Sequence, residues 1–271
     1  ESLLEEARRI QQSILPRTFP EVGDYEVHAV TAPADAGGGD FYDFLKLGPD
    51  GFGAAIADAS GHGLLAALLV RDVYVGLRMG IGGDLKIARV IERVNRILNK
   101  SRLSTKFVSL FYGEFEANGE IIYANAGHPG PLHLHARTRS FTEMESTGMV
   151  LGPSPNAPYT RRAVKMEPGD LFFLYTDGIV EAHDQRGREF GLDRVRRGRR
   201  AGGHPMSLVN PNEVVTKALL RFVSVPGLPG QAALITLDNG LDHTKPNTLG
   251  PAGLASLEAA VRCRNEPRVV A

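Results

Sequence analysis

An acidic residue at the end of an apolar run places the tightest constraint on how this chain can fold. Residues 52–57 are apolar and rich in alanine, a composition that predicts a short buried β-strand ending beside Asp58. Small residues follow, and residues 64–70 then have the length and composition of a buried helix. A carboxylate at such a turn can hold a hard cation, because small neighbours let backbone oxygens and water reach the same ion. It can also simply cap the helix, and the stretch taken alone favours capping.

Two further acidic stretches favour a metal-binding role for Asp58 over a capping role. Asp40 lies upstream, directly after the three glycines 37–39, and Asp177 follows the apolar run 171–175 downstream. One acid at a strand end is ordinary, but three beside glycine indicate acids that converge on one site. Carboxylate oxygens are the ligands that Mg²⁺ and Mn²⁺ prefer. A nucleotide-binding loop at the glycines is disfavoured, because no Gly-Lys-Ser/Thr follows them.

Four motifs in a fixed order carry a resemblance to a known family. They are Gly38–Asp43, Asp58–Gly63, Tyr123–His128 and Tyr175–Ala182, and they recur with family-like gaps over about residues 10 to 237. On these residues the chain resembles the bacterial metal-dependent (PPM-type) serine/threonine phosphatases of the SpoIIE/RsbU kind. The ordered set is far more specific than any one of its motifs.

The resemblance implies a role for each acid. Asp58 would bridge two metal ions, either Mn²⁺ or Mg²⁺, and the carbonyl of Ala59 would add an oxygen ligand. Asp177 would hold one metal, while Asp40 would bind the second directly or through water. The reaction would be direct hydrolysis of phosphoserine or phosphothreonine, without a covalent enzyme intermediate.

Two histidines in the same motifs are weaker candidates. His62 and His128 could donate a proton or steady a loop, and a structural role is the commoner one for such residues. The substrate that the resemblance implies is a phosphorylated anti-anti-sigma (STAS-type) protein in a bacterial stress or sporulation-like switch.

The chain departs from the family pattern near its last predicted strand. There the family carries a pair of acids, one of them a metal ligand, whereas the matching stretch here begins with Gln231 and no acid falls between Glu213 and Asp238. We therefore expect one metal to be weakly bound and turnover to be low, and an acid at position 231 to tighten Mn²⁺ binding. The alternative is a non-catalytic pseudophosphatase that binds a partner and signals through its N-terminal helix.

Strands that pair as hairpins around two long helices predict an α+β layered fold. The turn Asn118-Gly119 is a strong hairpin signal, and a stripe of apolar residues from Ile87 to Leu98 marks one buried helix face. The resemblance sharpens this to a β-sandwich flanked by helix pairs, with the metals at one edge. Strands are expected near residues 25–32, 40–47, 52–57, 107–115, 120–126, 131–136, 140–145, 159–166, 170–175 and 232–237.

The N-terminal residues 1–15 predict an amphipathic helix. Its apolar seam has the spacing of a coiled coil and consists of Leu3, Ala7, Ile10 and Ile14. The helix could mediate a homodimer or lie on its own domain. In the family resembled, this segment joins a sensory domain to the phosphatase, and since the chain opens inside a helical pattern we expect it to be an excerpt of a longer protein.

These patterns divide the chain into three parts. We expect a linker helix over 1–20, a phosphatase domain over 21–238 and a disordered tail over 239–271, where Gly, Pro and Ala dominate without a core pattern.

The amino-acid composition limits the classes of partner and of structural site that we expect for this chain. Lys+Arg and Asp+Glu both number 31, so no global field favours nucleic acid or a membrane surface. The single cysteine, Cys263, excludes a disulfide framework and a cysteine zinc site. With no signal peptide and no apolar run long enough to span a bilayer, the sequence predicts a cytoplasmic protein.

Overall fold

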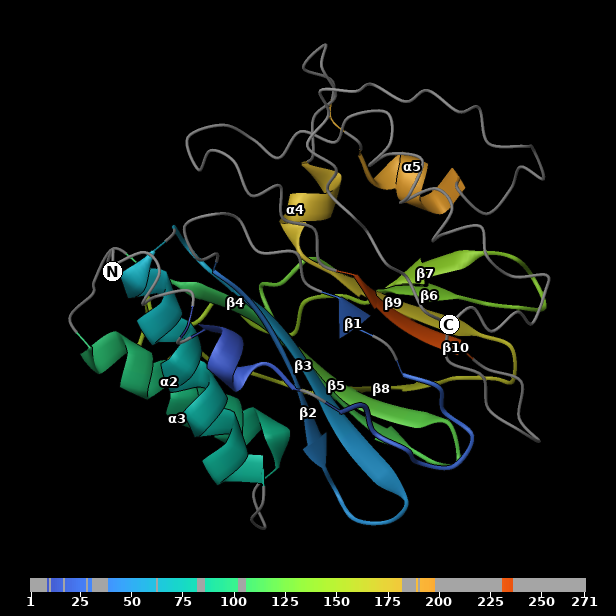
Figure 1. The fold of residues 1–271 in the computed structure, drawn as a ribbon, viewed down its shortest axis with the longest axis horizontal. Coiled ribbons are helices and arrows are strands. Elements are labelled where there is room, and N and C mark those ends of the chain that lie inside the picture. The colour runs from blue at the N-terminus through green and yellow to red at the C-terminus, as the bar shows by residue number, and fades with distance from the viewer. Residues whose placement is uncertain are drawn as a thin grey trace.

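The chain forms two five-stranded β-sheets that pack face to face, with a pair of long helices on the outer face of one of them (Figure 1). This computed structural model describes residues 9, 11–16, 18–27, 29–30, 39–61, 63–81, 86–101, 106–181, 189, 191–197 and 231–235. The predicted α+β sandwich is confirmed.

The first sheet is antiparallel throughout and has the order β2-β3-β4-β5-β8. Its strands are β2 Asp40–Lys46, β3 Gly51–Ala59, β4 Val108–Glu116, β5 Glu120–Ala126 and β8 Arg162–Lys165. The predicted Asn118-Gly119 turn joins β4 to β5, and Gly119 has the positive φ of 86° that such a turn needs.

The second sheet has the order β1-β10-β9-β6-β7. Its strands are β1 Ala29–Val30, β10 Gln231–Ile235, β9 Leu171–Tyr175, β6 Leu132–Leu134 and β7 Phe141–Glu143. β10 runs parallel to both β1 and β9, whereas β6 is antiparallel to β9 and to β7. β10, which is the last of the predicted strands, thus lies between β1 and β9.

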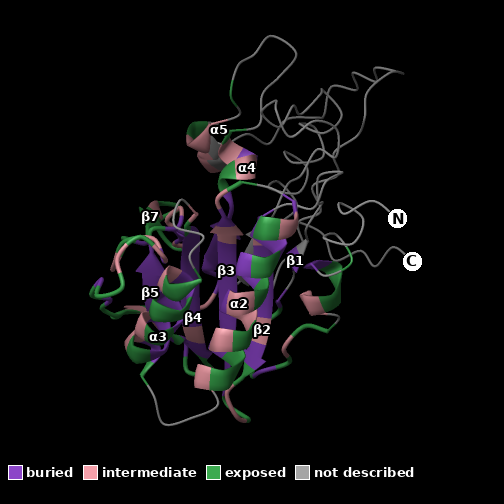
Figure 2. Ribbon diagram, turned by 90° about the vertical axis from the view of Figure 1, so that its left-hand side faces the viewer, coloured by how far each residue is buried: buried purple, intermediate pink, exposed green. Residues whose placement is uncertain are grey.

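Aromatic side chains fill the space between the two sheets. Phe52 of β3 stacks on Phe115 of β4 with ring centroids 5.0 Å apart, and Phe172 of β9 meets Phe115 edge-on at 5.9 Å. Strand β3 is buried along nearly its whole length because its other face is covered by helices (Figure 2). Its continuous apolar run, in place of strict alternation, reflects that double burial.

The two long helices are α2 Leu64–Ile81 and α3 Ile87–Lys100, and they pack against the first sheet. They approach closely at Gly76, where a Cβ would lie 2.7 Å from a methyl of Val94. The predicted stripe on α3 is buried as expected. This is the pair of long helices that the described residues contain.

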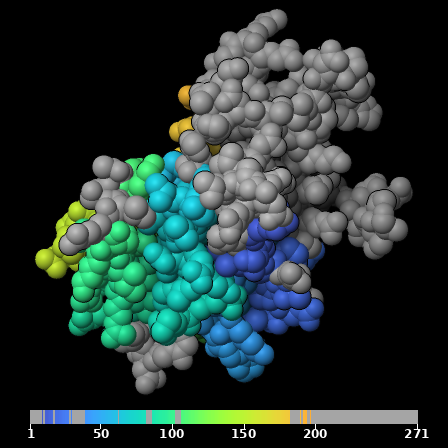
Figure 3. Space-filling view, turned by 60° about the vertical axis from the view of Figure 1, so that its left-hand side comes forward, coloured from blue at the N-terminus to red at the C-terminus, as the bar shows by residue number. Residues whose placement is uncertain are grey.

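The N-terminal segment lies against its own domain where the structure describes it. Residues 11–14 are helical, Ile14 packs on the cluster beneath α2, and Gln11 is buried. The described part of this segment lies against the body of the domain in the space-filling view (Figure 3). The seam residues Leu3, Ala7 and Ile10 lie outside the described residues, as does the tail 239–271. Short helices α4 Asp177–Val180 and α5 Leu192–Arg197 follow β9. Among the described residues, no helix has both the length and the apolar character needed to cross a bilayer.

Candidate metal centre

The pairing of β2 with β3 brings two of the predicted ligands together. Asp40 and Asp58 are direct partners across the antiparallel ladder. Both share a strand face with residues of the inter-sheet core, Tyr42 and Ile56, so both face the second sheet. Like charges directly opposite on a sheet destabilise it. This edge of the sandwich therefore has a local excess of negative charge that a cation would offset.

The second sheet delivers the third acid to the same edge. Thr176, the residue after β9, donates a hydrogen bond from Oγ1 to Oδ2 of Asp40 at 3.1 Å. Asp177 is next in the chain and opens α4. The structure thus brings Asp40, Asp58 and Asp177 together from three distant segments.

Electrostatics at this edge favour a cation. Burial, followed by the charges of Asp177 and Glu181, raises the pKa of Asp58 to about 7. Burial also raises the pKa of Asp177, although the backbone N–H of Gly178 opposes the shift. Each acid is therefore costly to ionise while its neighbours are charged, and a divalent ion would remove that cost.

Two oxygens of β3 converge in front of Gly39. A Cβ at this position would lie 2.5 Å from Oδ1 of Asp58 and would also collide with the carbonyl oxygen of Ala59. The backbone of Gly39 is held there by the N–H of Ala59, which donates to its carbonyl at 3.0 Å. Glycine keeps this space open, so the carboxylate and the carbonyl predicted as ligands face the same point. The donor set fits a hard divalent ion.

His128 joins two strands at this edge through both of its ring nitrogens. Its Nε2 donates to the carbonyl of Tyr175 at 3.1 Å, so its Nδ1 must accept the hydroxyl of Ser109 at 2.8 Å. Burial lowers the pKa of His128 to about 3, so the ring is neutral near pH 7. The ring joins the end of β9 to β4 and so positions Asp177 relative to Asp58. The other histidine candidate, His62, lies outside the described residues.

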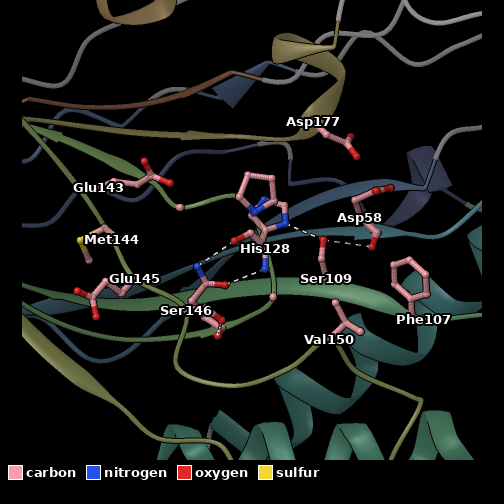
Figure 4. Close-up of a pocket in the computed structure, with 14 residues that line it drawn as sticks. Asp58, Phe107, Ser109, His128, Glu143, Met144, Glu145, Ser146, Val150 and Asp177 are labelled. Carbon is pink, nitrogen blue, oxygen red and sulfur yellow. Dashed lines mark hydrogen bonds between the residues drawn. The ribbon is translucent and has the colours of Figure 1, made fainter. Parts of the chain in front are cut away.

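A pocket of about 550 Å³ opens in front of the acids (Figure 4). Asp58 and Asp177 lie on one side of it, and Glu143 and Glu145 come from the segment at the end of β7. Its further lining includes Phe107, Ser109, Asn125, Gly127, His128, Pro129, Gly130, Met144, Ser146 and Val150. The pocket thus gives access from outside to Asp58 and Asp177.

Asp43 belongs to a different face of β2. It points towards α2, where Arg78 makes a two-pronged ion pair with its carboxylate at 2.8 Å and 2.8 Å. Burial raises the pKa of Asp43, although Arg78 and the N–H of Phe44 oppose the shift. Asp43 therefore ties β2 to α2 and is not among the converging acids.

Gln231 does not lie where a missing metal ligand would be needed. β10 is parallel to β9, with Gln231 opposite Leu171 and Ile235 opposite Tyr175. Position 231 thus lies at the end of the sheet away from Asp177, and the expectation that Gln231 offers a neutral oxygen ligand is wrong. The chain leaves β10 at the metal edge, and Asp238 follows Ile235 by three residues, outside the described ranges.

Two contacts at this edge escaped sequence analysis. Glu181 lies within a recognised motif, but only the fold shows its charge acting on Asp58. Gln11 of the N-terminal helix donates to the backbone carbonyl of Asp40 at 2.6 Å. A polar residue in a helical pattern gives no signal that it reaches a strand 29 residues away.

Comparisons with known proteins agree with this geometry. The family described as Stage II sporulation protein E (SpoIIE) matches residues 48–225. Protein IcfG of Synechocystis is 30% identical over 220 residues, covering 71% of this chain and 34% of that protein. Phosphoserine phosphatase RsbU of Bacillus subtilis is 27% identical over 187 residues, covering 69% of this chain and 56% of that protein. The chain thus spans about half or less of the length of these curated relatives.

Solved structures show the same fold. The RsbU and RsbW domains of a Mycobacterium tuberculosis protein align with a TM-score of 0.54 and 30% identity, over 66% of this chain and 52% of that one. The SiaA-PP2C domain of Pseudomonas aeruginosa aligns with a TM-score of 0.58 and 22% identity, over 72% and 79%.

Proposed function

The chain belongs to the SpoIIE family, and from that premise we propose that it hydrolyses phosphoserine or phosphothreonine on a regulatory protein in a metal-dependent reaction. The observation that carries the proposal is the convergence of Asp40, Asp58 and Asp177, from both sheets, beside a pocket open to a phosphorylated side chain.

The residues at this edge suit two ions of Mn²⁺ or Mg²⁺. Asp58 would bridge them, the Ala59 carbonyl and Asp177 would hold one, and Asp40 would bind the other directly or through water. When bound, such ions lower the pKa of water and neutralise charge on the transferred phosphoryl group. The raised pKa of Asp58 reflects buried negative charge that the ions would balance, and their binding would displace the proton from this carboxylate.

The protein's own residues contribute to the reaction by positioning the acids. Thr176 fixes the Asp40 carboxylate against the end of β9, while neutral His128 fixes that end against β4. The acids are therefore held in register before a substrate arrives, which is what hydrolysis of a phosphate ester at a fixed site requires.

We assign the substrate to the anti-anti-sigma (STAS-type) class, as a phosphorylated protein. The named relative RsbU is a phosphoserine phosphatase, and the aligned mycobacterial structure joins an RsbU domain to an RsbW domain. Residues 21–238 would form the catalytic domain, 1–20 a linker from an upstream sensory domain that could also pair two copies, and 239–271 a tail. A cytoplasmic location remains part of this proposal.

A partner-binding pseudophosphatase is the second candidate. It rests on the family pattern, which places a metal ligand in a stretch that holds no acid here, residues 230–237, although the register of β10 puts position 231 away from Asp177. A phosphatase and a pseudophosphatase would have the same fold and the same pocket. They would differ in whether phosphate is released.

Phosphate release from a phosphoserine protein or peptide, with and without Mn²⁺, distinguishes them. We expect Mn²⁺-dependent release that falls to background in Asp58→Asn. The matched control is Asp50→Asn, which changes an exposed acid at the tip of the same β2–β3 hairpin and should leave release unchanged. If the unmodified chain binds Mn²⁺ but releases no phosphate from any phosphoserine substrate, it is a pseudophosphatase.

A further inference from the structure

A second group of potential metal ligands lies at the opposite end of β9 from Asp177. Asp170 comes just before Leu171, the first residue of the strand, and Asp177 comes two residues after its last. Five residues at about 3.3 Å each put roughly 17 Å between the two ends. Whatever this group binds is therefore separate from the metal edge described above.

Three side chains meet there. Nε2 of His133 lies 2.7 Å from Oδ2 of Asp170, and Nδ1 of His135 lies 3.8 Å from the same oxygen. The three ligand atoms all lie within 4.8 Å of one another. The histidines are two apart, one on β6 and one just past it, so they share a face of the strand and their ring centroids are 4.0 Å apart.

Outer contacts hold Asp170 and His135 in place. Oδ1 of Asp170 accepts the N–H of Ala136 at 2.8 Å, and Oδ2 accepts the N–H of Glu167 at 2.9 Å. Nε2 of His135 bonds the hydroxyl of Thr142 at 2.8 Å, which leaves Nδ1 directed at Asp170. Metal-binding histidines usually have such a partner on the second ring nitrogen.

Burial and protonation also suit a metal. The side chains of His133 and Asp170 are only 4% and 3% exposed. Burial lowers the pKa of His133, although Asp170 opposes the shift, so its ring is neutral near pH 7. Burial alone would raise the pKa of Asp170, but the N–H groups of Ala136 and Glu167 together with His133 lower it, and the net shift is downward. A neutral imidazole and an ionised carboxylate are the forms that bind metal ions.

We propose that His133, His135 and Asp170 form a binding site for Zn²⁺, with water completing the coordination. Two imidazole nitrogens and one carboxylate oxygen are typical of zinc, whereas Mg²⁺ and Mn²⁺ favour oxygen ligands. Four-coordinate Zn²⁺ with bonds of about 2.0–2.2 Å places its ligand atoms roughly 3.3 Å apart. The 3.8 Å separation would shorten by about half an ångström, which rotation of the half-buried His135 ring can supply. The 2.7 Å separation between His133 and Asp170 would lengthen by about as much through a small shift of these two side chains.

Zn²⁺ binding would break one hydrogen bond and would connect three strands. The proton that His133 shares with Asp170 must move from Nε2 to Nδ1, so the ion replaces a hydrogen bond. In return the ion joins β6, and through Thr142 also β7, to the start of β9. Zn²⁺ would therefore fasten this hairpin to the strand that carries Asp177 at its other end.

The test is Zn²⁺ titration of the whole metal-free chain by calorimetry in excess Mg²⁺, which occupies oxygen sites. His135→Gln removes one ligand at a half-buried position and should weaken Zn²⁺ binding by more than about 100-fold, while Thr142→Val should weaken it about 10- to 100-fold. His204→Gln is the control for one lost histidine and should change nothing.

A second readout identifies the ligands. Cu²⁺ placed in the site should show two coupled nitrogens by electron paramagnetic resonance in the unmodified chain and one in His135→Gln. Circular dichroism of the metal-free variants checks that each is folded. The proposal is overturned if the unmodified chain holds no nitrogen-coordinated ion, or if folded His135→Gln binds Zn²⁺ as tightly with the same nitrogen pattern. Neither readout depends on phosphate hydrolysis.

Discussion

The two ends of β9 hold the same kind of acid in opposite electrostatic states. At one end, burial raises the pKa of Asp177 and, together with nearby acids, that of Asp58. At the other end, two backbone N–H groups and His133 lower the pKa of Asp170 despite its burial. The difference lies in the partners: Asp170 is surrounded by donors from its own chain, whereas the acids at the metal edge face one another. A cation bound at this edge would offset the negative charge that raises the pKa of Asp58.

Removing one charge from each end should change stability in opposite directions, and this is the largest effect we expect. In metal-free protein at pH 8, Asp58→Asn should stabilise the fold by about 1 kcal/mol or more, because it removes repulsion among buried acids. Asp170→Asn should destabilise it by about 2 kcal/mol, because charged hydrogen bonds are lost. Urea unfolding measures both.

Asp50→Asn is the matched control and should stay within about 0.5 kcal/mol of the unmodified chain. Destabilisation of similar size by Asp58→Asn and Asp170→Asn would remove the contrast between the two ends.

The N-terminal helix should influence only the metal edge. Gln11→Leu removes the hydrogen bond to the Asp40 carbonyl and should weaken Mn²⁺ binding about 2- to 10-fold, the equivalent of one net hydrogen bond. Calorimetric titration of Mn²⁺ measures this, and Zn²⁺ binding at the His133 end should not move. Weaker binding of both Mn²⁺ and Zn²⁺ would mean that Gln11→Leu disturbs the whole β-sandwich.

An acid at position 231 should have the smallest effect. Because Gln231 pairs with Leu171, it lies at the Asp170 end of β9, and Gln231→Asp should leave Mn²⁺ affinity unchanged. Asp238→Asn is the variant to compare with Gln231→Asp. The chain leaves β10 beside Tyr175, and Asp238 follows three residues after Ile235. Tighter Mn²⁺ binding in Gln231→Asp would show that the parallel register of β10 is wrong.

The convergence of the three acids was predictable because each acid lies where a strand meets a turn. Asp58 lies near the end of apolar β3 and Asp177 just past the end of apolar β9, whereas Asp40 follows three glycines and begins β2. Asp40, Asp58 and Asp177 could be recognised from local composition, and the family resemblance supplied their roles. The hairpins were predictable for the same local reason, as Asn118-Gly119 illustrates.

What could not be predicted depends on register between distant strands. The placement of Gln231 depends on whether β10 runs parallel or antiparallel to β9, and composition is silent on that choice. The meeting of His133 and His135 with Asp170 depends on the pairing of β6 with β9. Gln11 could not be recognised because its partner is a backbone carbonyl.

The most direct test of this contrast is an NMR titration of the aspartate side-chain carboxyl carbons from pH 3 to 9, without divalent ions and then with Mg²⁺. We predict that Asp58 in the metal-free chain titrates near pH 7 while Asp170 titrates below its ordinary range. With Mg²⁺ the pKa of Asp58 should fall well below 7, and that of Asp170 should not change. The stability of the metal-free fold would accordingly decline as the pH rises from about 4 to 7, because the folded state holds the proton of Asp58 more tightly than the unfolded state. An ordinary pKa for Asp58 without ions, or one that Mg²⁺ does not lower, would contradict a cation site at this edge.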